Sequence, residues 1–180
     1  YFATNPLFRW KDANNDCEDR ANAISILLDN WNIPNFKGWV FSGFYLRKGT
    51  GSLINLWNYH VAALLAVRDG AEKSFYIIDP ATSANLLKLE EWANAVTDQP
   101  FSYYFIKASE YYIFPSGKID RDNWHKRDRR NYKWTIQGLS GINGVSKTGK
   151  AQLCFNKKRI KRTEQRFKEL MVNKPPLVPL

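Results

Sequence analysis

Asp16-Cys17-Glu18-Asp19-Arg20-Ala21 is the stretch that decides the fold, because it begins a run with helical spacing and places a thiol in the first turn. Apolar side chains recur with the period of an α-helix as far as Trp31. Asn32-Ile33-Pro34-Asn35 then ends the run. Asn15 and Glu18 stand three residues apart, the spacing of a capping box. We therefore predict a helix over residues 17–31.

A hairpin is predicted further along the chain. Residues 58–67 are apolar on both faces, which is typical of a central strand. Asp69-Gly70 is a hairpin signal, so residues 73–79 are expected to return antiparallel to the first strand. Pairing about this turn brings His60 and Asp79 almost opposite each other, within reach of a side-chain contact.

The remaining segments indicate an α+β domain in which the first helix packs on an antiparallel sheet. Polar, charged residues at 116–130 are expected to form a long loop. Further strands are predicted at residues 37–45, 103–114 and 133–137, and further helices at residues 86–96 and 156–172.

Cys17, His60 and Asp79 together have the chemistry of a thiol nucleophile. A helix N-terminus lowers the pKa of a thiol, an imidazole can hold the proton, and a carboxylate can orient the imidazole. Each residue alone is more often part of a core, but the reaction needs all three placements together. His125, the other histidine of the chain, lies in the charged segment and is the less suitable base.

The composition indicates one domain without a disulfide framework. The chain has 180 residues and 44% apolar content, enough for one core. Its two cysteines allow at most one disulfide bridge, between Cys17 and Cys154. The number of cysteines therefore does not indicate whether the protein works in an oxidising or a reducing compartment. If Cys17 is the nucleophile, Cys154 is expected to be a free, core-like thiol. No apolar run is long enough to span a membrane, and the start of the chain suggests a processed or excised domain.

The chain is basic, with a formal net charge of +10 at pH 7. Lysines and arginines gather in residues 121–133 and again in residues 147–168. Such clusters can be a solvated face, attract an acidic protein, or bind an anionic surface or a nucleic acid. Metal-ligand spacing, a glycine-rich phosphate loop and a dinucleotide-binding fingerprint are absent from the sequence, so no metal or cofactor is predicted.

Three motifs carry a resemblance to a known family. Asp-Cys-x-x-Arg-Ala at 16–21, Trp-x-Tyr-His-Val-Ala at 57–62 and Ile-Ile-Asp-Pro at 77–80 resemble those of bacterial protein-glutaminase. This family of protein-glutamine deamidases has a core similar to those of transglutaminases and papain-like cysteine proteases. The similarity extends over residues 8–141, which we interpret as the core of a single catalytic domain spanning 1–180.

The resemblance implies a role for each matching residue. Cys17 would be the nucleophile, His60 the general acid and base, and Asp79 the orienting carboxylate, while Trp57 and Tyr59 would flank the substrate channel. The implied activity is a cofactor-independent hydrolysis of exposed glutamine side chains in proteins to glutamate and ammonia. It also implies a secreted enzyme, with an inhibitory pro-segment or an immunity partner as further expectations.

Two departures from the family pattern leave alternatives open. The chain lacks the disulfides of the secreted family, and its basic appendage at 144–180 has no counterpart there. A toxin or effector domain delivered into another cell therefore stays possible. The same three residues would also serve a cysteine protease or a transglutaminase, so these activities stay open as well. A non-enzymatic nucleic-acid-binding module is the remaining alternative, although it leaves the ordered triad unexplained.

Overall fold

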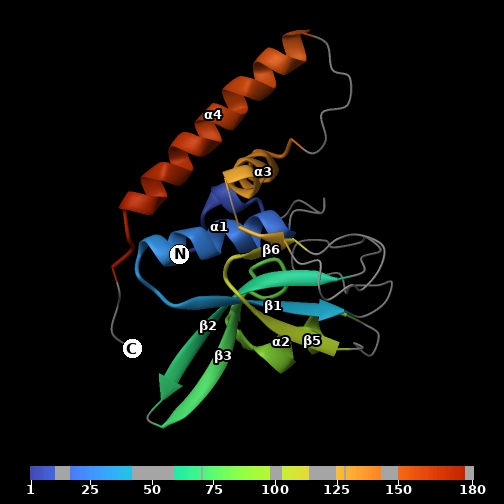
Figure 1. Ribbon diagram of the computed structural model, residues 1–180, viewed down its shortest axis with the longest axis vertical. Helices are drawn as coiled ribbons and strands as arrows, with labels where there is room; N and C mark the ends of the chain where they lie inside the picture. The colour runs from blue at the N-terminus through green and yellow to red at the C-terminus, as the bar shows by residue number, and fades with distance from the viewer. Residues whose placement is uncertain are drawn as a thin grey trace.

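The computed structural model describes residues 1–10, 17–41, 59–69, 71–97, 103–113, 125–127, 129–142 and 150–176 (Figure 1). It confirms the predicted α+β class. Its elements in chain order are η1 (Pro6–Phe8), α1 (Cys17–Asn30), β1 (Asn35–Phe41), β2 (His60–Asp69), β3 (Glu72–Ile78), β4 (Leu87–Lys88), α2 (Leu89–Ala95), β5 (Tyr103–Ala108), β6 (Tyr111–Ile113), β7 (His125–Lys126), α3 (Arg129–Leu139) and α4 (Lys150–Val172).

Helix α1 is the buried centre of the molecule. It begins at Cys17, as predicted, and most of its side chains are buried. The helix ends in a Schellman arrangement, in which Ile33 N–H donates to Leu28 C=O at 2.8 Å and Asn32 takes a positive φ of 56°. Asparagine tolerates this left-handed conformation better than most residues, so it ends the helix at the predicted place. The predicted capping residue Asn15 lies outside the described residues.

Five strands form one antiparallel sheet in the order β4-β3-β2-β1-β5. The predicted hairpin is confirmed, because β2 pairs with β3 from Asp69↔Glu72 to Ala63↔Ile78. His60 is the first residue of β2, and Asp79 follows the last residue of β3. The register therefore makes the two residues diagonal neighbours rather than direct partners, a spacing that side chains on one face still bridge.

Helices cover both faces of the sheet. In Figure 1, α1, α3 and α4 stack on one side of the sheet and α2 lies on the other. Ala63 and Ile78 join the core beneath α1, while Leu64 and Ile77 pack with Trp92 of α2. Alternation of side chains along each strand produces this division. Because even-numbered residues of β2 face α2, His60 enters the layer that contains Trp92.

A buried polar network holds α1 against its neighbours. Lys37 of β1 is fully buried, and its Nζ donates to Asn22 Oδ1 at 2.8 Å and to Tyr111 C=O at 2.7 Å. Asn22 Nδ2 in turn donates to Thr135 Oγ1 of α3 at 2.9 Å. Burial lowers the pKa of Lys37 well below its usual value. Unpaired polar groups cost free energy in an interior, so this network fixes how α1 sits between the sheet and α3.

Several predicted elements differ in the structure. The predicted loop 116–130 includes β7 at 125–126 and the start of α3 at 129, while 116–124 and 128 lie outside the described residues. Residues 133–137 are not a strand but part of α3, because Asn131, Thr135 and Leu139 recur at helical spacing and are buried, in part against α1. Residues 87–88 form the short strand β4, so the second helix begins at Leu89. The predicted strand 103–114 is divided by a turn into β5 and β6. In α3, tertiary packing overrides the strand preference of its aromatic and β-branched residues.

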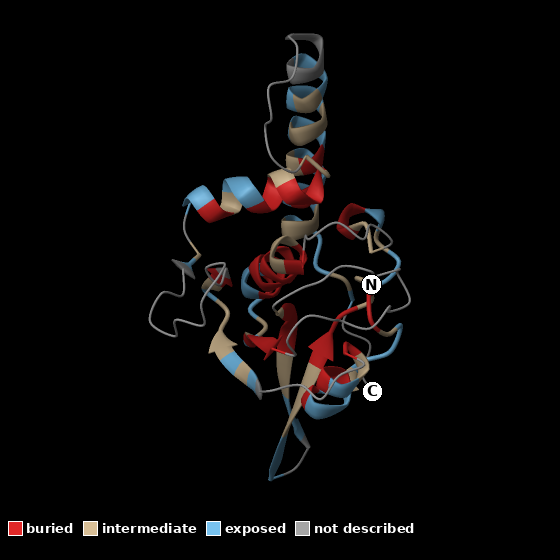
Figure 2. Ribbon diagram, turned by 90° about the vertical axis from the view of Figure 1, so that its right-hand side faces the viewer, coloured by how far each residue is buried: buried red, intermediate tan, exposed pale blue. Residues whose placement is uncertain are grey.

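Helix α4 is longer than predicted and only its second half joins the core. Phe167 is fully buried and Thr163 is buried, whereas Lys157 and Lys158 are exposed. Figures 1 and 2 show the first half of α4 extending beyond the body of the molecule. The described helices include none that combines the length and the apolarity needed to cross a bilayer.

Gly138 permits α3 to lie close to the first turn of α1. A Cβ atom at this position would stand 1.8 Å from Asp19 Oδ2 and 2.8 Å from Asp19 Cβ. The Asp19 carboxylate cannot easily move aside, because Tyr112 Oη donates a hydrogen bond to its Oδ1. A glycine is therefore required where the two helices meet.

Gly138→Ala should destabilise the protein by about 1–3 kcal/mol through overpacking. An ordinary glycine-to-alanine change inside a helix would have the opposite sign, with a gain of up to about 1 kcal/mol. Urea unfolding measures the difference, and Lys133→Ala on the exposed face of α3 serves as the control, with little expected change. An alanine variant more stable than the wild type would contradict this packing.

Candidate active site

A buried histidine–carboxylate pair lies at the end of the central hairpin. His60 Nε2 stands 2.8 Å from Asp79 Oδ2, and the two residues are only 1% and 6% exposed. The same Oδ2 accepts hydrogen bonds from Thr82 Oγ1 at 2.5 Å and from Trp92 Nε1 at 2.9 Å. The predicted contact between His60 and Asp79 is therefore present, supported by two further donors.

The environment keeps Asp79 ionised. Burial alone would raise the pKa of this carboxyl group, but the charge of His60 and the hydrogen bonds from His60, Thr82 and Trp92 lower the pKa to about 2. Because the pKa of Asp79 is lower in the folded state than the value of about 3.9 in the unfolded state, its ionised form stabilises the fold at pH values above about 3.9. This contribution is lost as the pH falls toward 2.

Cys17 shares a small cavity with the pair. The thiol is the first side chain of α1 and is 5% exposed, and Val61, which follows His60, offers it a backbone hydrogen bond. Cys17, His60 and Asp79 line the same cavity, together with Arg20 and Trp10. The structure thus brings together the three residues that the sequence singled out.

Glu18 holds the thiol in its resting position. Cys17 Sγ donates to Glu18 Oε2 at 3.4 Å, and Tyr59 Oη donates to Glu18 Oε1. Burial, followed by the charge of Glu18, raises the pKa of Cys17 well above its usual value. The prediction of a depressed thiol pKa was wrong, because desolvation and a neighbouring carboxylate outweigh the helix N-terminus.

The predicted substrate residues are only partly described. Tyr59 is half-buried, and its ring lies 5.3 Å from that of Trp39 and 6.0 Å from that of Phe41, measured between centroids. Burial, together with Glu18, raises the pKa of its hydroxyl. Trp57 and the side chain of His125 lie outside the described residues.

The second cysteine departs from its prediction. Cys154 is exposed on α4 rather than core-like, and it forms no disulfide with Cys17. Cys154 belongs to the first half of α4 (Lys150–Val172), and this half extends beyond the body of the molecule, which explains why Cys154 is not buried. Within the described parts of the chain, no three His, Cys, Asp or Glu side chains gather closely enough to hold a metal ion.

Sequence reasoning gave no catalytic role to Glu18, which contacts the thiol, or to Arg20, which lines the cavity. Glu18 is adjacent to the nucleophile in sequence, and Arg20 follows Cys17 by three positions, which places it on the same side of the helix. That spacing was the available signal for Arg20. Arg20 is 3% exposed as a residue, and its guanidinium carbon lies over the ring of Trp10, 5.6 Å from the centroid.

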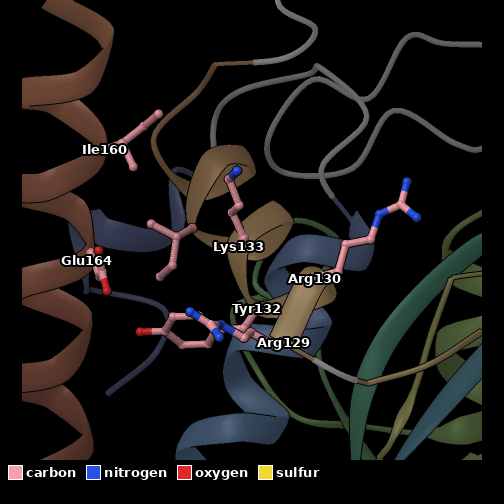
Figure 3. Close-up of a pocket in the computed structure, with 7 residues that line it drawn as sticks. Arg129, Arg130, Tyr132, Lys133, Ile160 and Glu164 are labelled. Carbon is pink, nitrogen blue, oxygen red and sulfur yellow. The ribbon is translucent and has the colours of Figure 1, made fainter.

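A separate groove opens between α3 and α4. It has a volume of about 590 Å³, and Figure 3 shows Ile160 and Glu164 of α4 on the side opposite Tyr132 of α3. Glu164 pairs with Lys168 at 2.8 Å, which offsets its negative charge. The groove thus combines an apolar floor with a cationic edge, and it is lined by Arg129, Arg130, Tyr132, Lys133, Ile136, Ile160 and Glu164.

Comparisons with known proteins agree on one family and fold. A family model described as glutaminase matches residues 2–96, a range that includes Cys17, His60 and Asp79. The solution structure of protein-glutaminase from Chryseobacterium proteolyticum is similar, with a TM-score of 0.57, 21% identity and 78% of each chain covered. A crystal structure of protein-glutaminase gives a TM-score of 0.56 and 23% identity, covering 75% of this chain and 78% of the other. No curated protein sequence gives a significant match.

The burial of Cys17 determines the order in which the two thiols should be modified. At neutral pH, iodoacetamide should alkylate the exposed Cys154 before Cys17, because the thiolate is the reactive form and the raised pKa of Cys17 keeps it protonated. In a Cys154→Ser protein, the pH profile of Cys17 alkylation should have a midpoint above the usual value of about 8.5. A midpoint below pH 7 would contradict the described environment.

Glu18→Gln provides the matched variant for that measurement. It retains the shape of the side chain and one of its two acceptor oxygens and removes its charge, so the midpoint of Cys17 alkylation should move to lower pH. Glu90→Gln, at an exposed position on α2, should leave the midpoint unchanged.

Proposed function

Because the chain belongs to the glutaminase family, we propose that it removes ammonia from glutamine side chains of proteins through a thioester on Cys17. The family match confirms the predicted deamidating hydrolase. Protein-bound glutamine is proposed as the substrate because both similar structures are named protein-glutaminase. The observation that carries the proposed mechanism is the His60–Asp79 hydrogen bond in the cavity that also contains the Cys17 thiol.

Each side chain has a defined role in this mechanism. Asp79 accepts a hydrogen bond from Nε2–H of His60 and so stabilises this tautomer. Nδ1 is then unprotonated and can accept the proton of the thiol. The raised pKa of Cys17 means that the thiol must lose its proton during the attack rather than before it. His60 is therefore a general base in the first half of the reaction.

The reaction then proceeds in two steps, formation of the thioester and its hydrolysis. Cys17 sulfur bonds to the carboxamide carbon while its proton passes to His60, and the C–N bond breaks as His60 returns that proton to the departing ammonia. Water next attacks the thioester, with its proton taken by His60, and the C–S bond breaks to restore the thiol. The substrate protein leaves with a glutamate in place of a glutamine.

The related activities are not favoured. A cysteine protease or a transglutaminase would use the same three residues, but the family match is to glutaminase. A nucleic-acid-binding module would give the buried pair no role, and it would leave the oriented carboxylate unexplained. Secretion or delivery into another cell, a pro-segment and an immunity partner stay predictions that rest on the resemblance.

We assign the recognition of acidic protein substrates to the basic appendage. The match to the family model ends at residue 96, before α3 and α4 begin. Their groove joins an apolar floor to the cations Arg129 and Lys133, a surface that suits a segment with apolar anchors and acidic flanks. In this proposal residues 8–141 supply the chemistry and, through α3, one wall of the groove, while α4 supplies the other wall and helps to select the protein.

Ammonia release tests the reaction and its orienting carboxylate together. The wild type should release ammonia from a glutamine-containing protein without chain cleavage or cross-linking, whereas Asp79→Asn should lower kcat by about 10²–10⁴ through loss of the correct tautomer. Circular dichroism verifies the fold of the variant. Cleaved or cross-linked products would favour a related activity, and full turnover by Asp79→Asn would refute the assigned role.

Charge reversal separates substrate recognition from chemistry. A Lys157→Glu, Lys158→Glu, Arg159→Glu protein should turn over a short neutral peptide normally, because these residues lie on α4 away from the catalytic cavity. Its kcat/KM on an acidic protein should fall, and the deficit should shrink with added salt, since screening acts over about 8–10 Å at physiological ionic strength. Loss of peptide turnover in the folded variant would place α4 in the active site.

A further inference from the structure

Arg20 brings an unused donor into the catalytic cavity. The residue is 3% exposed and lines the cavity with Cys17 and His60. Its Nη2 is buried and makes no hydrogen bond. Within the described residues, moreover, no ion pair of Arg20 is present. A buried guanidinium without an anion is costly, so its position calls for a partner that arrives during function.

The carboxylates nearest to the cavity are already engaged. Asp79 Oδ2 accepts from His60, Thr82 and Trp92, and the carboxylate of Glu18 accepts from Cys17 and Tyr59. None of these hydrogen bonds comes from Arg20. The guanidinium is therefore not placed there to satisfy a neighbouring acid of the resting site.

The contact with Trp10 leaves the donors of Arg20 available. The guanidinium carbon lies over the indole ring, 5.6 Å from its centroid, within the range of a cation–π contact. Nη2, one of the donors of the guanidinium, stays without a hydrogen bond beside this contact. The contact with Trp10 thus helps to hold the side chain in the cavity while Nη2 stays available to a ligand.

We propose that Arg20 donates a hydrogen bond to the glutamine carboxamide oxygen and stabilises the oxyanion that forms when Cys17 attacks. The inference rests on the proposed function. As the C–S bond forms, the C=O π electrons move to the oxygen, and the negative charge appears next to a cation that is already desolvated. Arg20 then supplies a side-chain donor that complements the backbone N–H of Cys17. The charge returns to the C=O bond when ammonia leaves.

A peptide aldehyde tests the proposal without turnover. An aldehyde in place of the carboxamide adds the thiol to give a hemithioacetal whose oxygen occupies the oxyanion position, whereas the matching alcohol forms no adduct. Arg20→Gln should weaken aldehyde binding by about 10²–10³, the usual effect of losing one oxyanion donor, and leave alcohol binding unchanged. Its kcat on a glutamine peptide should fall by a similar factor with little change in KM.

Two further variants make the result decisive. Arg20→Lys keeps the positive charge but loses the planar arrangement of donors, so this variant should bind the aldehyde with intermediate affinity. It also provides a test if Arg20→Gln fails to fold. Arg127→Gln removes an arginine that pairs with Asp29 instead, and it should bind the aldehyde normally. Equal weakening of aldehyde and alcohol, or unchanged aldehyde binding, would overturn the role of Arg20. Failure of the wild type to form an adduct would instead refute the nucleophile.

Discussion

The hydrogen bond between His60 and Asp79 is the interaction on which the rest of the site depends. It joins the start of β2 to the end of β3, and the donors that support it come from the turn after β3 and from α2. Removing the carboxylate would therefore affect both the imidazole tautomer and the packing of Trp92. The pair is buried so deeply that its geometry is set by the fold and not by the solvent.

A closed resting site has consequences for the chemistry. Cys17 lies between opposite charges, since Glu18 raises its pKa and the cation of Arg20 lowers it, while burial adds the largest effect. A protonated, shielded thiol is protected from adventitious oxidation, which proceeds through the thiolate. In the same arrangement His60 takes the proton of the Cys17 thiol only when the substrate is bound. The attack of the sulfur and the proton transfer are therefore coupled.

Local patterns predicted the elements that their own residues determine. The spacing from Cys17 to Trp31 and the stop at Asn32 identified α1, and the turn at Asp69-Gly70 identified the hairpin. Residues 133–137 were misassigned because the burial of Thr135 against α1 comes from distant chain contacts. The thiol pKa was wrong for a related reason, since the depth of Cys17 and the rotamer of Glu18 are properties of the packed structure. The exposure of Cys154 likewise depends on where α4 leaves the core.

Trapping the covalent intermediate tests the central claim most directly. A glutamine peptide is mixed with the protein, the reaction is quenched with acid during turnover, and the protein is digested and weighed by mass spectrometry. We predict an adduct on Cys17 with the mass of the peptide less one ammonia, absent from His60→Ala and Cys17→Ser proteins. Steady deamidation with unmodified Cys17, and continued turnover by Cys17→Ser, would contradict the account.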